Sequence, residues 1–241
     1  MTSASTAGGR RARCQGGRQL GVVMLETRFP RLPGDIGCPE TFAFPVRYRV
    51  VAGAVPHRVV VEGDRSLLLP FVAAAKALAD DGADAIATSC GFLVRFQREM
   101  AAAVPVPVWT SSLLLVAEVE AALGRGERAG VVSVDAASLG AADLAAAGAS
   151  ADTPVEGLAP SSGFRRALLE NHATFDRCEA EAATVAAARR LVARHPEAAA
   201  IVLECTNLPP YADAVRRATG RPVHDITTMI ASRFAALERT P

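Results

Sequence analysis

The sequence predicts an α/β protein of two pseudo-symmetric lobes, each a four-stranded, mainly parallel sheet flanked by helices. Short β-rich runs alternate along the chain with longer stretches of Ala, Leu and Arg, which is the pattern of βαβ units. A polar turn at residues 124–127 divides the strands into two groups. A weak internal repeat places one copy in each group. We therefore expect the active site in a cleft between the lobes.

Each predicted strand is a short run of β-forming residues, and each predicted helix is a longer run of helix formers. The strands are expected at residues 20–25, 47–51, 85–88, 106–109, 129–134, 155–158, 199–203 and 222–224. The helices are expected at residues 66–80, 92–103, 112–123, 137–147, 175–194 and 211–219, with a last helix from Thr227.

The first lobe is expected to comprise residues 19–112 and 212–241, and the second lobe residues 113–211. Residues 1–18 are rich in Ser, Ala, Gly and Arg and are expected to form a disordered N-terminal tail. The proline-rich segment 26–45 interrupts the alternation, and this proline density excludes a helix. Because it leaves the carboxyl end of a strand, we expect a functional loop or lid.

The composition excludes several classes of protein. Half of the residues are hydrophobic, 21% are charged and the net charge is +1, so no net field attracts nucleic acid or an anionic membrane. No apolar run approaches the roughly 18 residues of a membrane span. Five dispersed cysteines indicate reduced thiols and a cytoplasmic protein. The expected partner is a small-molecule carboxylate, and a homo-oligomer is left open.

No cofactor and no metal is expected. Lys76 is the only lysine, and it lies in the middle of a predicted helix, which argues against Schiff-base chemistry. The spacing of the histidines and cysteines matches no metal-ligand motif; the histidines are His57, His172, His195 and His224.

The internal repeat is the strongest functional signal. Its copies are Ala-Asp-Ala-Ile-Ala-Thr-Ser-Cys-Gly-Phe-Leu at residues 83–93 and Ala-Ala-Ala-Ile-Val-Leu-Glu-Cys-Thr-Asn-Leu at residues 198–208. In both, a strand run ends at the cysteine and helical sequence follows. Cys90 and Cys205 are thus expected at the beginning of helices, where a thiol pKa is lowered, and opposite each other across the cleft.

Two opposed thiols are what inversion at an acidic carbon requires. One thiolate removes the α-proton, and the opposite thiol returns a proton to the other face. The carbanion needs hydrogen-bond donors nearby, and Ser89, Thr206 and Asn207 flank the thiols. The competing interpretation is that both cysteines are small core residues, but their matching contexts favour catalysis.

These motifs, Ala-Thr-Ser-Cys-Gly-Phe and Leu-Glu-Cys-Thr-Asn-Leu-Pro, resemble the paired cysteine motifs of the aspartate/glutamate/hydantoin racemase superfamily. The resemblance extends over nearly the whole chain from Gln19. It implies cofactor-independent racemisation or epimerisation of an amino acid or a derivative, with Cys90 and Cys205 as the two bases. It also implies that Thr206 binds the substrate carboxylate, and that Glu26 and Thr27 form the acidic-polar pair after the first strand.

The sequence departs from glutamate racemases beside both cysteines. Gly91 and Phe92 replace their usual Asn-Thr pair, and Asn207 replaces a histidine; the apolar Phe92 argues against glutamate itself. Arylmalonate decarboxylases and maleate isomerases share the implied fold, so decarboxylation or isomerisation of a dicarboxylate is an alternative. A non-catalytic two-lobed small-molecule binding protein is the alternative from another class.

Other residues are weaker candidates for the site. Arg28 could clamp a carboxylate, and Thr110 and Ser111 could either donate to substrate or cap a helix. Cys38 and Asp135 have some support from their positions, while Cys178 is expected to be structural. The predicted substrate-binding residues are Glu26, Thr27, Arg28, Ser89, Gly91, Phe92, Thr110, Ser111, Thr206 and Asn207.

Overall fold

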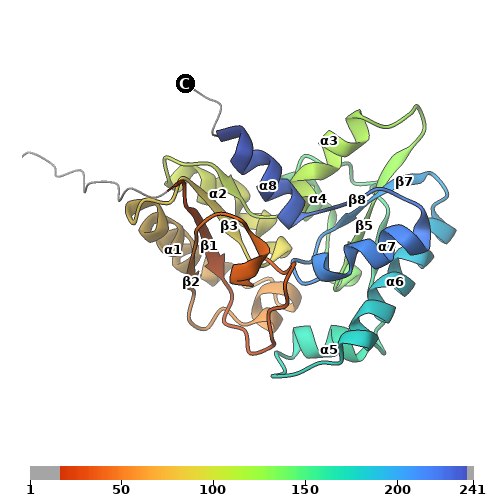
Figure 1. Cartoon of the computed structure of the whole chain (residues 1–241), viewed down its shortest axis with the longest axis horizontal. Coiled ribbons are helices and arrows are strands. Elements are labelled where there is room, and N and C mark those ends of the chain that lie inside the picture. The colour runs from red at the N-terminus through yellow and green to blue at the C-terminus, as the bar shows by residue number, and fades with distance from the viewer. Residues whose placement is uncertain (1–16, 238–241) are drawn as a thin grey trace, which may run out of the picture.

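Two parallel four-stranded sheets form the framework of the protein (Figure 1). The computed structural model describes residues 17–237, so the tail expected at residues 1–18 lies outside the described residues apart from Gly17 and Arg18. The strands of the first sheet are β1 (Leu20–Met24), β2 (Val46–Val50), β3 (Ala85–Thr88) and β4 (Val108–Trp109). Those of the second sheet are β5 (Arg128–Ser133), β6 (Val155–Gly157), β7 (Ala198–Leu203) and β8 (Val223–Asp225).

The two sheets have the same topology. The first has the order β2-β1-β3-β4 and the second has the order β6-β5-β7-β8, so the second strand of each half lies on one edge and the fourth on the other. Every strand pair in the described residues is parallel. This confirms the predicted α/β fold with two pseudo-symmetric sheets.

The described residues contain eight α-helices, of which α8 follows the last strand. They are α1 (Leu68–Asp80), α2 (Gln97–Ala103), α3 (Val116–Ala121), α4 (Ala141–Ala146), α5 (Gly163–Leu169), α6 (Arg177–Arg194), α7 (Ala212–Thr219) and α8 (Ile226–Leu237). Helix α5, which was not expected from the sequence, has two turns, and its start is capped by Ser162, which accepts a hydrogen bond from the Arg165 amide. Such a short helix depends on its cap and on packing, because two turns are unstable alone.

The expected division of the C-terminal segment needs correction. Residues 212–241 were assigned to the first lobe, but β8 pairs with β7 in the second sheet, because α7 is the crossover of a β7–α7–β8 unit. Only α8 returns to the first sheet (Figure 1). Its buried residues pack against β1, β3 and β4; they are Ile226, Met229, Ile230 and Phe234. Asp225 lies at the junction between the lobes, where β8 ends and α8 begins. Its carboxylate accepts hydrogen bonds from the Thr227 and Thr228 amides in the first turn of α8.

The lobes share one hydrophobic core. A single cluster of buried residues includes Phe92 and Val94 from the first lobe and Val134 and Leu168 from the second. Packing of this kind joins the lobes as closely as elements within one domain. None of the described helices has the length and apolar character needed to cross a membrane.

Candidate active site

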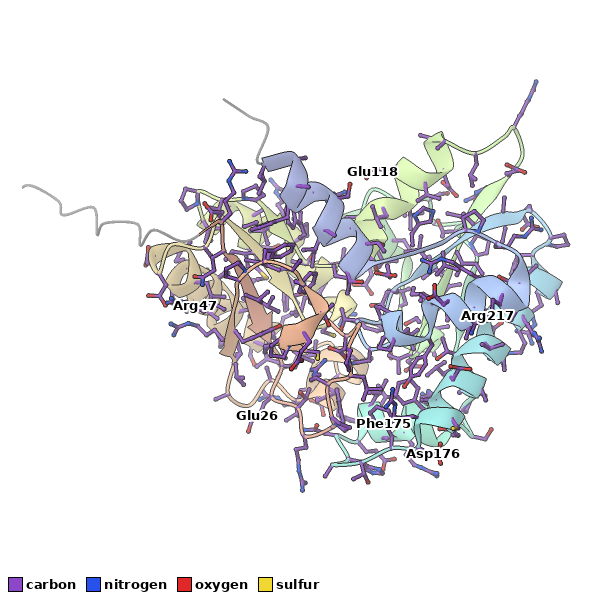
Figure 2. The ribbon with its side chains drawn as sticks, viewed as in Figure 1. Glu26, Arg47, Glu118, Phe175, Asp176 and Arg217 are labelled. Carbon is purple, nitrogen blue, oxygen red and sulfur yellow. The ribbon has the colours of Figure 1, made fainter. Side chains whose placement is uncertain are left out.

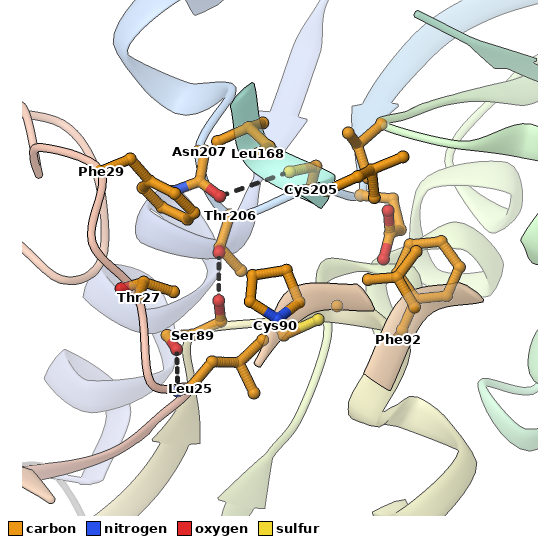
Figure 3. Close-up of a pocket in the computed structure, with 16 residues that line it drawn as sticks. Leu25, Thr27, Phe29, Ser89, Cys90, Phe92, Leu168, Cys205, Thr206 and Asn207 are labelled. Carbon is orange, nitrogen blue, oxygen red and sulfur yellow. Dashed lines mark hydrogen bonds between the residues drawn. The ribbon is translucent and has the colours of Figure 1, made fainter. Parts of the chain in front are cut away.

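The two cysteines of the repeat line the same cavity. Cys90 follows β3 and precedes a short 3-10 helix at Gly91–Phe96, and Cys205 follows β7. Figure 3 shows their side chains on different sides of the pocket. The pocket has a volume of about 370 Å³, part of which is open to solvent, and the cysteines are 8% and 7% exposed. The structure thus brings together one thiol from each sheet.

Hydrogen bonds across the lobes hold these strand ends in place. The Thr206 hydroxyl donates to the Ser89 carbonyl at 2.7 Å, and the Ser112 hydroxyl donates to the Leu203 carbonyl at 2.7 Å. The Ser89 hydroxyl accepts from the Leu25 amide at 2.9 Å, which ties β3 to the end of β1. Residues adjoining both cysteines are therefore fixed relative to each other.

Both thiols are harder to ionise than the sequence predicted. Burial raises the pKa of Cys90 to about 12, and the nearby Glu204 carboxyl adds to the increase. Burial and then Glu204 also raise the pKa of Cys205 well above its ordinary value. The backbone amides of Phe92 and Asn207, respectively, lower these pKa values. The turn that follows each cysteine therefore lowers the thiol pKa as expected, but desolvation raises the pKa by more.

Glu204 also lines the cavity, although it was not among the residues expected from the sequence. Its side chain is fully buried; one carboxyl oxygen accepts from the Ser133 hydroxyl at 2.8 Å, and the other has no partner among the described residues. Burial raises its pKa to about 8, so the carboxyl is mostly neutral at pH 7. An acidic residue that ends an apolar strand, directly before a repeat cysteine, was the available signal.

The Glu204 carboxyl leaves no room for a side chain at position 91, which is a glycine. A Cβ atom at position 91 would lie 2.2 Å from Glu204 Oε1 and 2.4 Å from the Glu204 carbonyl oxygen. Real Cβ atoms do not approach other atoms so closely. The glycine that distinguishes this chain from glutamate racemases therefore makes room for Glu204 from the other lobe.

Most of the remaining cavity wall is apolar. Among the described lining residues there is no arginine and no lysine, and Glu204 is the one carboxyl group. The apolar lining residues are Leu25, Phe29, Pro56, Val60, Phe92, Val134, Leu168 and Leu169. Thr27, Ser89, Thr206 and Asn207, all predicted from the sequence, supply the other polar side chains.

The proline-rich loop contributes to the site, in the position that the sequence analysis expected for a lid. Thr27 and Phe29 line the cavity, and the Asp35 carboxylate accepts a 2.5 Å hydrogen bond from the side-chain amide of Asn207. The Asn207 side-chain oxygen in turn accepts from the Cys205 thiol at 3.7 Å. Asp35 pairs with Arg31 at 3.1 Å. The loop is thus connected through Asn207 to one of the cysteines.

Glu26 and Arg28 do not line the cavity, although the sequence analysis proposed both. Both side chains are exposed, and Figure 2 shows Glu26 at the periphery of the first lobe. The Glu26 carboxylate accepts from the Gly53 amide, and the Arg28 backbone amide donates to Asn171. Side chains alternate in direction after Leu25. Thr27 and Phe29 line the cavity, so Glu26 and Arg28 point away from it.

Thr110 and Ser111 are also outside the cavity. Both hydroxyls form hydrogen bonds in the interior of the first lobe. The Thr110 hydroxyl donates to Gln97 at 2.6 Å, and the Ser111 hydroxyl accepts from the Leu113 amide as a helix cap. The weaker candidates lie elsewhere too: Cys38 donates to Glu40, and Asp135 pairs with Arg165 at 3.2 Å. Over residues 17–237, no group of three or more His, Cys, Asp or Glu side chains could hold a metal ion.

Comparisons with known proteins identify the family. The family model of Asp/Glu/Hydantoin racemases matches residues 55–233. A dimethylsulfoniopropionate lyase of Durusdinium sp. clade D is 35% identical over 215 residues, covering 86% of this chain and 70% of the relative. Dimethylsulfoniopropionate lyase 7 of Emiliania huxleyi is 32% identical over 237 residues, covering 92% of this chain and 68% of the relative.

Among solved structures, unliganded arylmalonate decarboxylase has the same fold, with a TM-score of 0.56 and 20% identity over 86% of this chain and 87% of the other. The racemase-type fold expected from the sequence is therefore correct, whereas the named relatives above are lyases and not isomerases. The chain belongs to the Asp/Glu/hydantoin racemase family.

Proposed function

We propose that this protein is a lyase that eliminates dimethyl sulfide from dimethylsulfoniopropionate or a similar β-sulfonium carboxylate. The proposal is supported by two relatives named dimethylsulfoniopropionate lyases, at 35% and 32% identity. The single observation that carries it is that Cys90 and Cys205, one from each sheet, line one otherwise mostly apolar cavity. This site offers acid/base groups for a carbon acid but no group that would bind a second carboxylate by charge.

The reaction needs one base. A cysteine thiolate takes the proton from the carbon next to the carboxylate, and the C–H electron pair forms the new C=C bond. The bond from the β-carbon to sulfur breaks, and its electron pair leaves with neutral dimethyl sulfide. The products are dimethyl sulfide, acrylate and a thiol that returns its proton to solvent. The second thiol lies on another side of the same cavity, where it can contact the substrate.

The cavity suits a small zwitterion. Phe29 and Phe92 line it, and aromatic rings attract sulfonium cations as they attract the guanidinium groups of Arg31 and Arg95, which lie 4.8 Å and 5.6 Å from the centres of these two rings. A bound sulfonium also favours ionisation of a nearby thiol, since an opposite charge stabilises the thiolate. This cation offsets part of the desolvation that raises the pKa of both thiols.

The hydroxyls of Ser89 and Thr27 are the best donors for the substrate carboxylate. The Ser89 hydroxyl accepts from the Leu25 amide and the Thr27 hydroxyl accepts from Arg31. Neither hydroxyl donates to an acceptor among the described residues, so each hydroxyl hydrogen can be donated to a ligand. Thr206 is less suitable, because its hydroxyl hydrogen is directed to the Ser89 carbonyl. The resemblance assigns carboxylate binding to Thr206. We assign this role instead to Ser89, its hydrogen-bond partner.

The proposal is tested by incubating the purified protein with dimethylsulfoniopropionate and measuring dimethyl sulfide by gas chromatography. We expect release by the wild type, a loss of at least about 100-fold in the single variant, Cys90→Ser or Cys205→Ser, that removes the base, and a loss at least as large in the double variant. Cys178→Ser is the matched control, because Cys178 is exposed on α6. Absence of dimethyl sulfide from the wild type, or its undiminished release by the double variant, contradicts the proposal.

Racemisation is the second candidate. It is favoured by the matching positions of the thiols at the ends of β3 and β7, since inversion uses a group on each face of the carbon. Incubation of amino acids in heavy water distinguishes the two activities: a racemase incorporates α-deuterium and changes the optical rotation, while the proposed lyase leaves amino acids unchanged.

A further inference from the structure

Glu204 is a buried ionisable group that the proposed elimination does not use. Its backbone is fixed, because its amide donates to the Val132 carbonyl at 2.8 Å. One carboxyl oxygen accepts from Ser133, while the other is buried without a partner among the described residues. A buried carboxylate oxygen without a donor is costly, whereas a protonated carboxyl carries no charge. The environment therefore favours the neutral acid.

The carboxyl is close to both thiols. Glu204 directly precedes Cys205, and its Oε1 atom lies so near Gly91, which follows Cys90, that a Cβ atom there would be 2.2 Å away. All three groups line the same cavity. Charges in such a desolvated space interact far more strongly than they do in water.

We propose that Glu204 is a third proton-binding group of this site, coupled to both thiols, and that its carboxyl keeps its proton whenever either thiol is ionised. This inference rests on the proposed function in giving the thiols the chemical role. Glu204 is a positioning residue in this scheme, because it acts through the cysteines. Two negative charges in one buried cavity are avoided, so the site holds a single negative charge at a time.

The titration of the three groups then follows one order. The pKa of Glu204 is raised to about 8, and Glu204 raises the pKa of both cysteines. Below pH 8, the population with one thiolate beside a neutral carboxyl increases about tenfold per pH unit. Above pH 8 this population stops increasing, because Glu204 has then lost its own proton and its carboxylate holds most of the charge.

The other charged groups that face the site occur in pairs. Asp143 raises the pKa of Glu204 and Arg95 lowers it, and these two side chains form an ion pair at 3.0 Å. Arg31 and Asp35, which act on the thiols, also pair with each other. Each pair is close to neutral as a unit, so Glu204 dominates the change of charge near pH 8.

The test measures the alkylation rate of Cys90 and Cys205 by iodoacetamide as a function of pH, resolved by peptide mass spectrometry. In the wild type, we expect both rates to increase up to about pH 8 and then to flatten. In Glu204→Gln, which retains the shape without a titratable proton, the increase continues, so that the rates at pH 9 exceed those of the wild type about tenfold. An unchanged profile in Glu204→Gln overturns the proposal.

Two further variants complete the test. Asp135→Asn is the matched control, because it removes a buried carboxylate outside the cavity and should leave the bend of the profile in place. Ser133→Ala removes the hydrogen bond that lowers the pKa of Glu204, so the bend should move to higher pH; a fixed bend contradicts the proposal even if Glu204→Gln does not fold. Alkylation requires no substrate. The coupling between Glu204 and the thiols can therefore be tested whether or not the protein releases dimethyl sulfide.

Discussion

The Thr206 hydroxyl and the Ser89 carbonyl form a 2.7 Å hydrogen bond that joins the two lobes beside the two cysteines. Ser89 precedes Cys90 and Thr206 follows Cys205, so this bond fixes the backbone on which each thiol is carried. Both partners are buried, and the contact is therefore shielded from water. The spacing of the thiols depends on this bond.

Thr206→Val should weaken both stability and activity. The variant retains the shape of the side chain but leaves a buried carbonyl without its donor, which costs about 1 to 3 kcal/mol. We also expect kcat to fall by about tenfold, because the thiols shift relative to the substrate. Urea unfolding and dimethyl sulfide release measure the two effects. Thr206→Ser retains the hydroxyl and should behave like the wild type; equal losses in both variants would contradict this role.

Gly91→Ala should destabilise the fold strongly. The added Cβ atom would meet the Glu204 carboxyl and the Glu204 carbonyl oxygen, at 2.2 and 2.4 Å, and the backbone atom cannot move aside without shifting β7. We expect a loss of about 2 kcal/mol or more in urea unfolding. Gly140→Ala is the control, since a Cβ atom there meets nothing within 4 Å, and it should cost less than about 1 kcal/mol. Comparable losses in the free energy of unfolding of the two variants would contradict the close contact between residue 91 and Glu204.

The stability of the fold should decrease as the pH rises from 5 to 8. The pKa of Glu204 is raised from 4.5 to about 8 in the folded state, so the folded protein binds this proton more tightly than the unfolded chain. Its favourable contribution is complete below the unfolded pKa and is lost as the pH passes through the folded pKa. Denaturant midpoints at pH 5, 6.5 and 8 should fall less in Glu204→Gln than in the wild type. Parallel curves for the two proteins would be evidence against a buried acid at this position.

Asp35→Ala should impair catalysis through Asn207. Without its partner the Asn207 amide is free to rotate, and the side-chain oxygen that accepts from Cys205 loses its fixed orientation. We expect kcat/KM for dimethyl sulfide release to fall by about tenfold, with partial recovery in Asp35→Asn, which restores an acceptor for the amide. Glu40→Gln alters an exposed carboxylate of the same loop and is the control. No recovery in Asp35→Asn would show that the charge, and not the orientation of the amide, is what matters.

Phe29→Leu should weaken binding of a sulfonium substrate. The change keeps the cavity wall apolar but removes the aromatic face, worth about 1 kcal/mol or about fivefold in KM. Phe175→Leu is a matched control, because Phe175 packs on Phe164 with ring centroids 4.9 Å apart and does not line the cavity. Steady-state kinetics with dimethylsulfoniopropionate distinguish them. An unchanged KM in Phe29→Leu rules out this ring as the cation site.

The sequence could predict the features that depend on local pattern. All eight strands were expected near their observed positions, because short β-rich runs between helical stretches are specific to parallel α/β sheets. The placement of Cys90 and Cys205 at strand ends followed from the repeat, and the position of the proline-rich loop at the site followed from its departure from β1. Each of these inferences uses neighbouring residues only.

The missing features depend on contacts between distant residues. The pKa of each thiol is governed by burial, which depends on the packing of both lobes. The position of Glu204 in the site depends on its close approach to Gly91 of the other lobe, and that of Asp35 depends on the hydrogen bond between the loop and Asn207. Glu26 and Arg28 lie outside the cavity while Thr27 and Phe29 line it, because a shift of one residue after a strand end decides whether a side chain faces inward or outward.

The continuous core across both lobes determines how a ligand reaches the thiols. Separating the lobes would expose hydrocarbon on Phe92 and Leu168 and would break the Arg95–Asp143 ion pair, so a wide hinge opening is unfavourable. The proline-rich loop supplies Thr27 and Phe29 to the pocket wall and is part of neither sheet. With the proposed function, we therefore expect substrate to enter and dimethyl sulfide to leave through a movement of this loop, without separation of the lobes.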